Sequence, residues 1–255
     1  MTQELAGKTA LVTGASRGLG VHMALRLAEA GAMVAVNYAS DQAAAGETVR
    51  RIEEAGGTAF AVQAKLGSEA AGKALAEAAL AGFGERGAGP GLDILVNNIG
   101  GGDYAPIAQV SEEMFDHEMS NNLKGALFLT KAFYNNFNDF GRVINISSTG
   151  ARLTDPNIIV YTMAKAALEA FTRVLAQDLG PRGITVNSVG PGFTAGPTNA
   201  YIVEDPVAAK QVTDVTALNR FGTPEEIADV VYFLASPLGR WVTAQNIEAS
   251  GGFKL

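Results

Sequence analysis

The chain of 255 residues contains no cysteine and two histidines. Without cysteine it forms no disulfide, carries no catalytic thiol and offers no thiolate ligand to a metal. His22 and His117 lie far apart in the sequence, so we expect each to have a surface or packing role. We therefore predict no metal site.

Basic runs and long apolar runs are also missing. The formal net charge is −7, which argues against nucleic acid or an anionic membrane as a partner. The longest apolar stretches are far shorter than a membrane span, and residues 1–7 are polar, unlike a secretory signal. These features predict a cytoplasmic protein that acts on a small molecule.

What the sequence does have is a regular alternation of apolar and amphipathic segments. Short apolar runs predict strands at residues 9–13, 33–37, 58–62, 93–96, 142–146, 184–189 and 245–248. Amphipathic stretches predict helices at 18–30, 41–55, 69–83, 111–135 (with a bend), 158–179 and 224–235, and a short one near 206–212. This order predicts an α/β fold with one Rossmann-like, doubly wound parallel sheet of about seven strands and helices on both faces. We expect residues 1–255 to form a single domain.

A glycine-rich segment, TGASRGLG at residues 13–20, joins the first predicted strand to the first helix. Glycines at this point allow a tight turn and a close approach of the backbone to a pyrophosphate. The helix that follows adds unpaired N–H groups and the positive end of its dipole. The position of the segment therefore predicts a dinucleotide site.

The end of the second strand indicates which dinucleotide is bound. An acid there would accept hydrogen bonds from the ribose 2′-hydroxyl, but the first acid is Asp41. Asn37, Tyr38 and Ser40 offer neutral hydrogen bonds instead, and the Arg17 guanidinium is suited to a 2′-phosphate. These residues favour NADP(H) over NAD(H).

A second group of polar residues indicates catalysis. Tyr161 and Lys165 are four residues apart at the start of a predicted helix, which places both on one face. Ser147 and Ser148 follow the fifth strand, and Asn98 follows the fourth. Open α/β sheets bind ligands at this carboxyl end, so the spacing predicts that these side chains meet there.

With these motifs the chain resembles the short-chain dehydrogenase/reductase family over essentially its whole length. The resemblance is to the compact single-domain type that includes 3-oxoacyl-carrier-protein reductases. It rests on the glycine segment, the runs NNIG at 97–100 and NLKG at 122–125, Ser148, Tyr161 with Lys165, and Pro191-Gly192. The thirteen-residue separation of Ser148 from Tyr161 selects Ser148 over Ser147, and the NLKG run selects Asn122 over Asn121.

The resemblance implies an oxidoreductase that transfers a hydride between NADP(H) and a carbonyl or alcohol substrate. It assigns proton transfer to Tyr161, cofactor binding and a lowered phenol pKa to Lys165, the substrate oxygen to Ser148, and a water-holding role to Asn122. The implied cofactor contacts are Gly14, Ser16, Arg17, Gly18, Leu19, Gly20, Asn37, Tyr38, Ser40, Leu66, Asn98, Gly100, Tyr161, Lys165, Pro191, Gly192 and Thr194.

Four positions depart from the family pattern. Ile99 replaces a small residue and is expected to crowd the cofactor wall slightly, and Leu66 occupies the place of an acid that meets adenine. Ala244 replaces a glycine, and Ser250 replaces an aspartate. None of the four belongs to the proposed catalytic group, so we expect activity to survive.

Residues 192–220 form a long irregular stretch that suits a substrate lid. Its apolar side chains predict a partly apolar pocket, and we expect Tyr104 to form part of the pocket wall. A carrier protein would require a basic rim, which Arg182 supplies and Asn138 and Asp139 do not, so a 3-oxoacyl-carrier-protein reductase remains an alternative. The resemblance also implies a homotetramer or a homodimer, through the helices at 111–135 and 158–179.

Two further alternatives stay open. The first is a cofactor-binding regulator of the same fold without turnover, although such a protein would have no physical need for all four of Asn122, Ser148, Tyr161 and Lys165. The second is a dehydratase or epimerase that holds NAD tightly, which would leave Arg17 unexplained.

Overall fold

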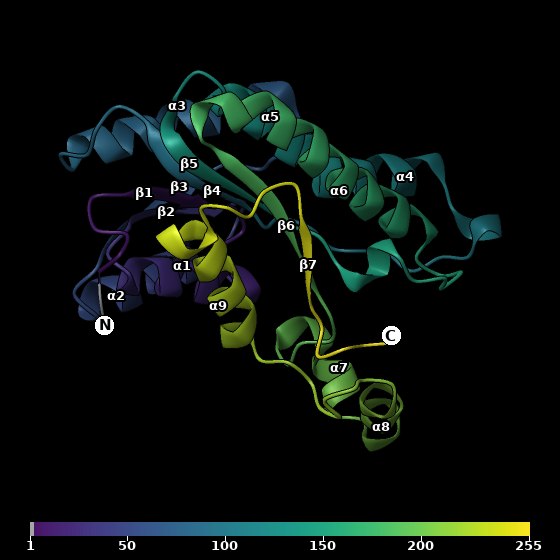
Figure 1. The fold of residues 1–255 in the computed structure, drawn as a ribbon. Helices are drawn as coiled ribbons and strands as arrows, with labels where there is room; N and C mark the ends of the chain where they lie inside the picture. Colours follow the sequence, from purple (N-terminus) through teal and green to yellow (C-terminus); the bar gives the residue numbers. More distant parts are fainter. Residues whose placement is uncertain (1–2) are drawn as a thin grey trace.

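The strands of the chain form one parallel sheet. The computed structural model describes residues 3–255, and in that range seven strands pair in the order β3-β2-β1-β4-β5-β6-β7 (Figure 1). Their bounds are β1 Thr9–Val12, β2 Met33–Tyr38, β3 Thr58–Gln63, β4 Leu92–Asn97, β5 Phe137–Ile146, β6 Thr185–Pro191 and β7 Asn246–Ala249. The predicted doubly wound sheet of about seven strands is confirmed.

Helices cover both faces of this sheet. One face carries α1 (Leu19–Glu29), α2 (Gln42–Glu54) and α9 (Pro224–Ala235), and the other carries α3 (Glu69–Glu85), α5 (Gly125–Phe133) and α6 (Ile159–Leu179). Successive residues of β1 alternate between the two cores: Val12 packs with the first set of helices, and Leu11 packs with the second. A strand buried on both sides is apolar throughout, which explains the continuous apolar runs in the sequence.

Local signals fix where several helices begin. Asp41, the predicted cap of α2, accepts a hydrogen bond from the Ala44 N–H at 2.9 Å. At α9, Thr223 and Glu226 form a reciprocal capping box, with Pro224 in the first turn. These contacts satisfy N–H groups that have no partner within their helices.

The sequence predicts one helix with a bend at residues 111–135, and the structure has an interrupted helix there. α4 (Glu112–Met119) leads into a π-helical turn at residues 120–124 and then into α5. β5 begins at Phe137, five residues before its predicted start, because Asn138 and Asp139 read as a loop in the sequence. Residues 192–220 contain two short helices, α7 (Ala200–Val203) and α8 (Pro206–Asp214), where we expected one.

The strand order reverses direction between β1 and β4, and the crevice at such a switch point is the usual ligand site of open α/β sheets. The glycine-rich segment, Asn98 and Ser148 follow strands that end at this edge, and Pro191 is the last residue of β6. α7 and α8 project from the body of the molecule at the lower side of Figure 1. Among residues 3–255, no helix combines the length and apolarity needed to cross a membrane.

Candidate active site

The glycine-rich turn has a backbone that side chains would disturb. Gly14 and Gly18 have φ angles of +62° and +57°, a region that L-residues with a Cβ rarely adopt. A Cβ on Gly20 would lie 2.5 Å from the Gly14 carbonyl oxygen, so only glycine allows α1 to pack this closely on the turn. No side chain caps the first N–H groups of α1. The turn therefore presents uncapped donors to an anion.

Asn98 holds this turn against the end of β4. Its Nδ2 donates to the Thr13 carbonyl at 2.9 Å, and its backbone N–H donates to Thr13 Oγ1 at 2.8 Å. The Ile99 Cγ1 atom lies 3.1 Å from the position of a Cβ on Gly14, so this departure from the family pattern does lie at the wall of the turn. Thr13 was not singled out from the sequence, although it starts the glycine motif.

The residues expected to meet the adenosine ribose divide into two groups. Arg17 and Ser40 are exposed, and across residues 3–255 Arg17 has no hydrogen bond or ion pair. The Asn37 side chain is instead fully buried: its Oδ1 accepts from the Gly14 N–H at 3.2 Å, and its Nδ2 donates to the Val62 carbonyl at 3.2 Å. Asn37 thus braces the glycine turn from within the sheet.

Tyr38 also differs from expectation, because its side chain packs in the core beneath α2. Leu66 is buried as well, beside Gly125. Because they are buried, the Tyr38 and Leu66 side chains are poorly placed for direct contact with a cofactor. Arg17 and Ser40 are exposed and are better placed to contact a ribose phosphate.

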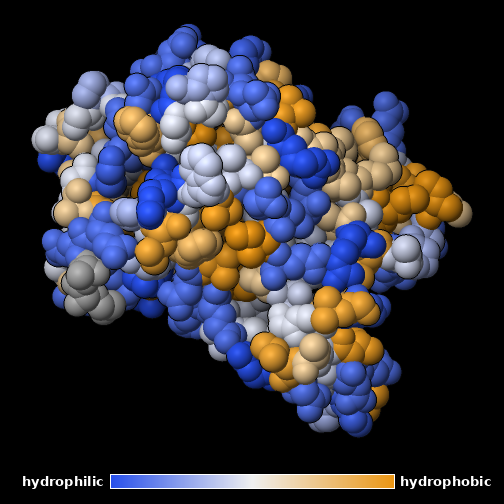
Figure 2. Space-filling model, viewed as in Figure 1, coloured by the Kyte–Doolittle hydropathy of each residue, from blue (hydrophilic) through white to orange (hydrophobic). Residues whose placement is uncertain are grey.

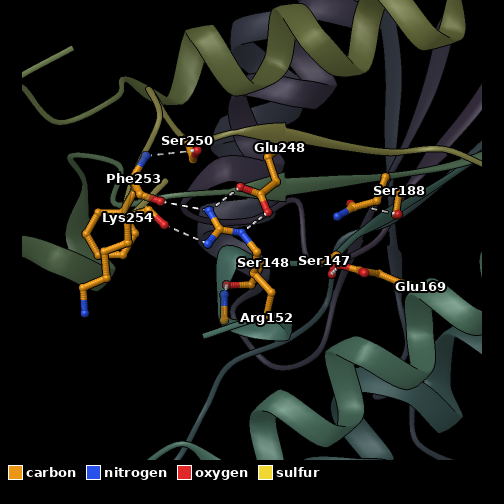
Figure 3. A network of polar contacts seen from close by, with 11 residues as sticks. Ser147, Ser148, Arg152, Glu169, Ser188, Glu248, Ser250, Phe253 and Lys254 are labelled. Atoms are coloured by element: carbon orange, nitrogen blue, oxygen red, sulfur yellow. Dashed lines mark hydrogen bonds and ion pairs between the residues drawn. The ribbon is translucent and has the colours of Figure 1, made fainter. Parts of the chain in front are cut away.

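The two serines after β5 have different surroundings. Ser147 is buried, and its hydroxyl donates to Glu169 at 2.7 Å. Ser148 Oγ accepts from the Gly150 N–H at 3.0 Å. It also lies close to Tyr161, because a Cβ on Gly150 would be 3.2 Å from Ser148 Oγ and 3.0 Å from Tyr161 Cε1. Figure 3 shows Ser147 directed toward Glu169 and Ser148 on the side of Arg152. The structure therefore brings Ser148, and not Ser147, to Tyr161.

Tyr161 stands between two glycines. A Cβ on Gly102 would lie 3.0 Å from the Tyr161 ring, and so would a Cβ on Gly150. Burial raises the pKa of Tyr161, the nearby Ser148 hydroxyl acts in the opposite direction, and the charge of Glu118 adds to the rise. The phenol is therefore held in its protonated form at neutral pH.

Lys165 lies one turn along α6 from Tyr161 and is 2% exposed. Its Nζ donates to the Ile146 carbonyl at 2.8 Å and lies 5.7 Å from the centroid of the Tyr161 ring. Burial lowers the pKa of Lys165 to about 8, and the charge of Glu118 opposes that shift. A lysine held in this way carries a positive charge next to the phenol at neutral pH.

Asn122 occupies the π-helical turn between α4 and α5. Its Nδ2 donates to the Gly101 carbonyl at 2.8 Å, and its Oδ1 accepts from the Gly101 N–H at 3.2 Å. A Cβ on Gly100 would lie 2.7 Å from Asn122 Oδ1 and 2.8 Å from Lys165 Nζ. These two polar groups can therefore approach the backbone of residue 100 only because it is a glycine. Asn122, Ser148, Tyr161 and Lys165 thus gather at one place.

The remaining predicted contacts follow β6. Gly192 packs on Ser250, where a Cβ would lie 2.9 Å from Ser250 Cα, and its N–H donates to the Ala249 carbonyl at 3.2 Å. Thr194 is buried, and its Oγ1 donates to the Gly192 carbonyl at 3.3 Å. Ser250, a departure from the family pattern, accepts from the Phe253 N–H at 3.4 Å and so stabilises the final turn of the chain.

Three contacts at this edge were missed from the sequence. Arg152 binds Glu248 through two hydrogen bonds of 2.5 and 2.9 Å and also donates to the carbonyls of Phe253 and Lys254 (Figure 3). The Tyr201 phenol of α7 raises the pKa of Tyr104, which places these two side chains near each other. Both contacts join residues about a hundred apart, for which the sequence holds no local signal. Glu118, a buried acid one turn before Asn122, had such a signal in its i, i+4 spacing.

Known proteins resemble this chain over its full length. A family model described as Enoyl-(Acyl carrier protein) reductase matches residues 14–254. An uncharacterised oxidoreductase of Methylorubrum extorquens is 44% identical over 98% of this chain and 99% of its own length. The short chain dehydrogenase/reductase AacuN of Aspergillus aculeatus is 38% identical over 97% of this chain and 96% of its own length.

Solved structures agree with these relatives. The angucycline C-6 ketoreductase LanV with bound NADP superposes with a TM-score of 0.94 at 41% identity, covering 100% of this chain and 98% of LanV. The structure of LanV with NADP and rabelomycin superposes with a TM-score of 0.90 and covers 98% of both chains.

Proposed function

The chain is an oxidoreductase of the short-chain dehydrogenase/reductase family, and we propose that it reduces a carbonyl group to an alcohol with NADPH, with Tyr161 as the proton donor. The observation that carries this proposal is the convergence of Ser148, Lys165 and Asn122 on Tyr161, next to a glycine turn with uncapped N–H groups. LanV, at 41% identity, has been solved with NADP bound.

Each side chain has a separate task in the reduction. NADPH, when bound, supplies a hydride to the carbonyl carbon. Ser148 donates a hydrogen bond to the carbonyl oxygen, and Tyr161 transfers its proton to that oxygen as negative charge develops there. Lys165 places a positive charge beside the phenol and makes proton release easier. Because burial raises the pKa of Tyr161, the protonated phenol needed for reduction predominates at neutral pH.

The glycine turn at Gly14, Gly18 and Gly20 would hold the pyrophosphate. The nicotinamide half would be held by Lys165, Pro191, Gly192 and Thr194. Two features favour NADPH over NADH. Arg17 is an exposed cation that makes no ion pair within residues 3–255, and Asp41 uses its carboxylate to cap α2. A 2′-phosphate would therefore meet the Arg17 guanidinium, while the carboxylate of Asp41 is directed to the N-terminus of α2.

The substrate we propose is a planar aromatic ketone, and residues 192–220 act as its lid. Tyr104 and Tyr201, which we expect to wall the pocket, are 68% and 62% exposed. Burial and the Tyr201 phenol raise the pKa of Tyr104 to about 12, so the Tyr104 phenol stays neutral. Figure 2 shows apolar groups interspersed on the projecting α7–α8 segment. Aromatic walls favour flat ring systems, and LanV has been solved with rabelomycin.

A carrier-protein substrate is less well supported. Arg182, the one basic residue expected at such a rim, donates to Asp139 at 3.0 Å and to the carbonyls of Tyr134 and Phe137. Its guanidinium is therefore used within the chain and adds little attraction for an acidic partner.

We also propose a homotetramer, since Trp241 is 96% exposed and Val174 on α6 is 72% exposed. Light scattering tests this directly, and a monomer mass would contradict it.

The experiment on function mixes the protein with NADPH, and separately with NADH, and follows nicotinamide absorbance over a panel of polycyclic aromatic ketones and 3-oxoacyl thioesters. Chromatography then identifies the alcohol product. Reduction of aromatic ketones with NADPH supports the proposal. Turnover confined to the thioesters would favour the carrier-protein alternative, and tight NADPH binding without reduction of any compound would favour a regulator.

A further inference from the structure

Glu118 is a carboxyl group in an unusual place. It lies on α4, whose other acids, Glu112, Glu113 and Asp116, face solvent, yet it is 2% exposed. A buried carboxyl group is unfavourable unless donors or opposite charges compensate it. Its surroundings therefore indicate what it does.

Both oxygens of Glu118 accept hydrogen bonds. Oε2 accepts from Asn122 Nδ2 at 3.0 Å, and Oε1 accepts from the Asp103 N–H at 2.7 Å. The first bond fixes the amide that also pairs with both backbone groups of Gly101. Glu118 thus connects α4 to the loop after β4. It also binds the Asn122 side chain, which lies with Lys165 Nζ against the backbone of Gly100.

The charged groups that face Glu118 come from three elements. Asp103 lies on the loop after β4, His117 lies on α4 itself, and Lys165 and Tyr161 lie on α6. His117 and Asp103 also contact each other, with 3.6 Å between Nδ1 and Oδ2. Asp103, His117 and Glu118 gather their donor atoms within 4.8 Å, but the oxygens of Glu118 are already engaged, so we assign the cluster no metal.

We propose that Glu118 is a positioning residue of this active site: its carboxylate holds the Asn122 amide and sets a negative charge against Lys165 and Tyr161, which fixes the pH range in which that pair works. The expected effect of Glu118 on the reaction rate rests on the proposed function. Its expected effect on the protonation of Lys165 and Tyr161 can be tested in the ligand-free protein. Glu118 touches no reacting atom; it acts through Asn122, Lys165 and Tyr161.

The sign of the effect follows from charge. A negative group nearby favours the protonated forms of Lys165 and Tyr161, and removing it lowers the pKa of both. Ketone reduction requires protonated Tyr161, so its rate falls as pH rises through that pKa. Loss of the Glu118 charge should therefore move the falling limb of the pH profile to lower pH.

The kinetic test compares three variants over a pH series with NADPH and a ketone that the wild type reduces. Glu118→Gln removes the charge, Glu118→Asp keeps it on a shorter side chain, and Glu113→Gln removes a solvent-exposed charge from the same helix. We expect Glu118→Gln to shift the limb to lower pH by about one unit. Glu118→Asp should lower kcat without the shift, and Glu113→Gln should match the wild type. A Glu118→Gln limb that coincides with the wild type would overturn the proposal.

A second readout needs no turnover and separates this inference from the proposed function. Carbon-13-labelled tyrosine gives an NMR signal for Tyr161, which is identified by its loss in Tyr161→Phe. In the ligand-free protein, Glu118→Gln should move the titration of that signal to lower pH by a similar amount. If no ketone is reduced but the signal moves, the proposed function fails and the role of Glu118 stands.

Should Glu118→Gln fail to fold, the coupling can be measured from its other side. Because two interacting charges shift each other, Lys165→Met should raise the pH at which the Glu118 carboxyl titrates, followed with carbon-13-labelled glutamate. A Glu118 titration that does not respond to Lys165→Met would contradict the proposal.

Discussion

The Lys165 ammonium donates to the carbonyl of Ile146, the last residue of β5, at 2.8 Å. This bond ties α6 to the strand end from which Ser148 follows two residues later. It also places Tyr161, one turn earlier on the helix, beside Ser148: a Cβ on Gly150 would lie 3.0 Å from the Tyr161 ring and 3.2 Å from Ser148 Oγ. The relative position of Ser148 and Tyr161 is thus set by a strand end and a helix that share one buried cation.

The neighbouring serines provide a matched pair for mutation. Ser148→Ala removes the hydroxyl beside Tyr161 and should lower kcat for ketone reduction by about 100-fold, the usual effect of losing a donor to developing negative charge. Ser147→Ala removes only a hydrogen bond to Glu169 and should leave kcat within about threefold, with a stability loss of about 1 kcal/mol. Steady-state kinetics and thermal unfolding measure both. Equal losses of kcat in the two variants would contradict the assignment.

Arg17 should discriminate between the two cofactors. Arg17→Ala removes a charge-assisted bond to the 2′-phosphate and should raise KM for NADPH by about 10- to 100-fold, while KM for NADH changes little. The control is Arg51→Ala, which removes the same charge from the exposed surface of α2. If both cofactors weaken equally in Arg17→Ala, the guanidinium does not read the phosphate.

Ala244 carries a backbone strain that a single change relieves. Its φ of +59° lies in the left-handed region, where a Cβ costs about 1–2 kcal/mol. Ala244→Gly should therefore raise the free energy of unfolding by about 0.5 kcal/mol after the greater chain entropy of glycine is included. Ala78→Gly, on the exposed side of α3, should lower it by about 1 kcal/mol. Denaturant titration measures both, and a destabilised Ala244→Gly would show that the strain is absent.

Asp93 links stability to pH. Burial raises its pKa, but hydrogen bonds from Lys8 and Thr9 outweigh that effect and hold the pKa below its usual value. A lowered pKa gives stability that is present above the unfolded-state value of about 4 and is lost as pH falls through the folded-state pKa.

Asp93→Asn should therefore cost about 2 kcal/mol at pH 7 and progressively less below about pH 4, where the wild type is also protonated. Asp116→Asn, an exposed change on α4, serves as the control. The measurement is the free energy of unfolding as a function of pH, and a cost that does not change with pH would refute the linkage.

Local patterns were sufficient to predict most of the fold. Asp41 and Gly31 mark helix ends through their own chemistry, and a strand buried on both sides is apolar whatever its neighbours. The start of β5 was missed because Asn138 and Asp139 are polar and Phe140 has a φ of +62°. Such a segment joins the sheet only through its partner strand.

Short motifs in the sequence were sufficient to predict which side chains gather at the candidate site. Contacts between residues far apart in the sequence were missed. The spacing of Ser148, Tyr161 and Lys165 placed them together correctly. The burial of Asn37 depends on carbonyls of β3, and the pairing of Arg152 with Glu248 depends on the last strand of the sheet. Neither relationship exists before the chain is folded, so no inspection of nearby residues reveals it.

Proton donation by Tyr161 can be tested in a single-turnover measurement. Protein loaded with NADPH is mixed with an excess of a ketone that the wild type reduces, and nicotinamide absorbance is followed for the wild type and for Tyr161→Phe, with NADPH affinity measured by fluorescence. If Tyr161 donates the proton, the reduction rate of Tyr161→Phe should be about 1,000-fold lower, with affinity for NADPH retained. A Tyr161→Phe protein that reduces the ketone within a few-fold of the wild-type rate would contradict it.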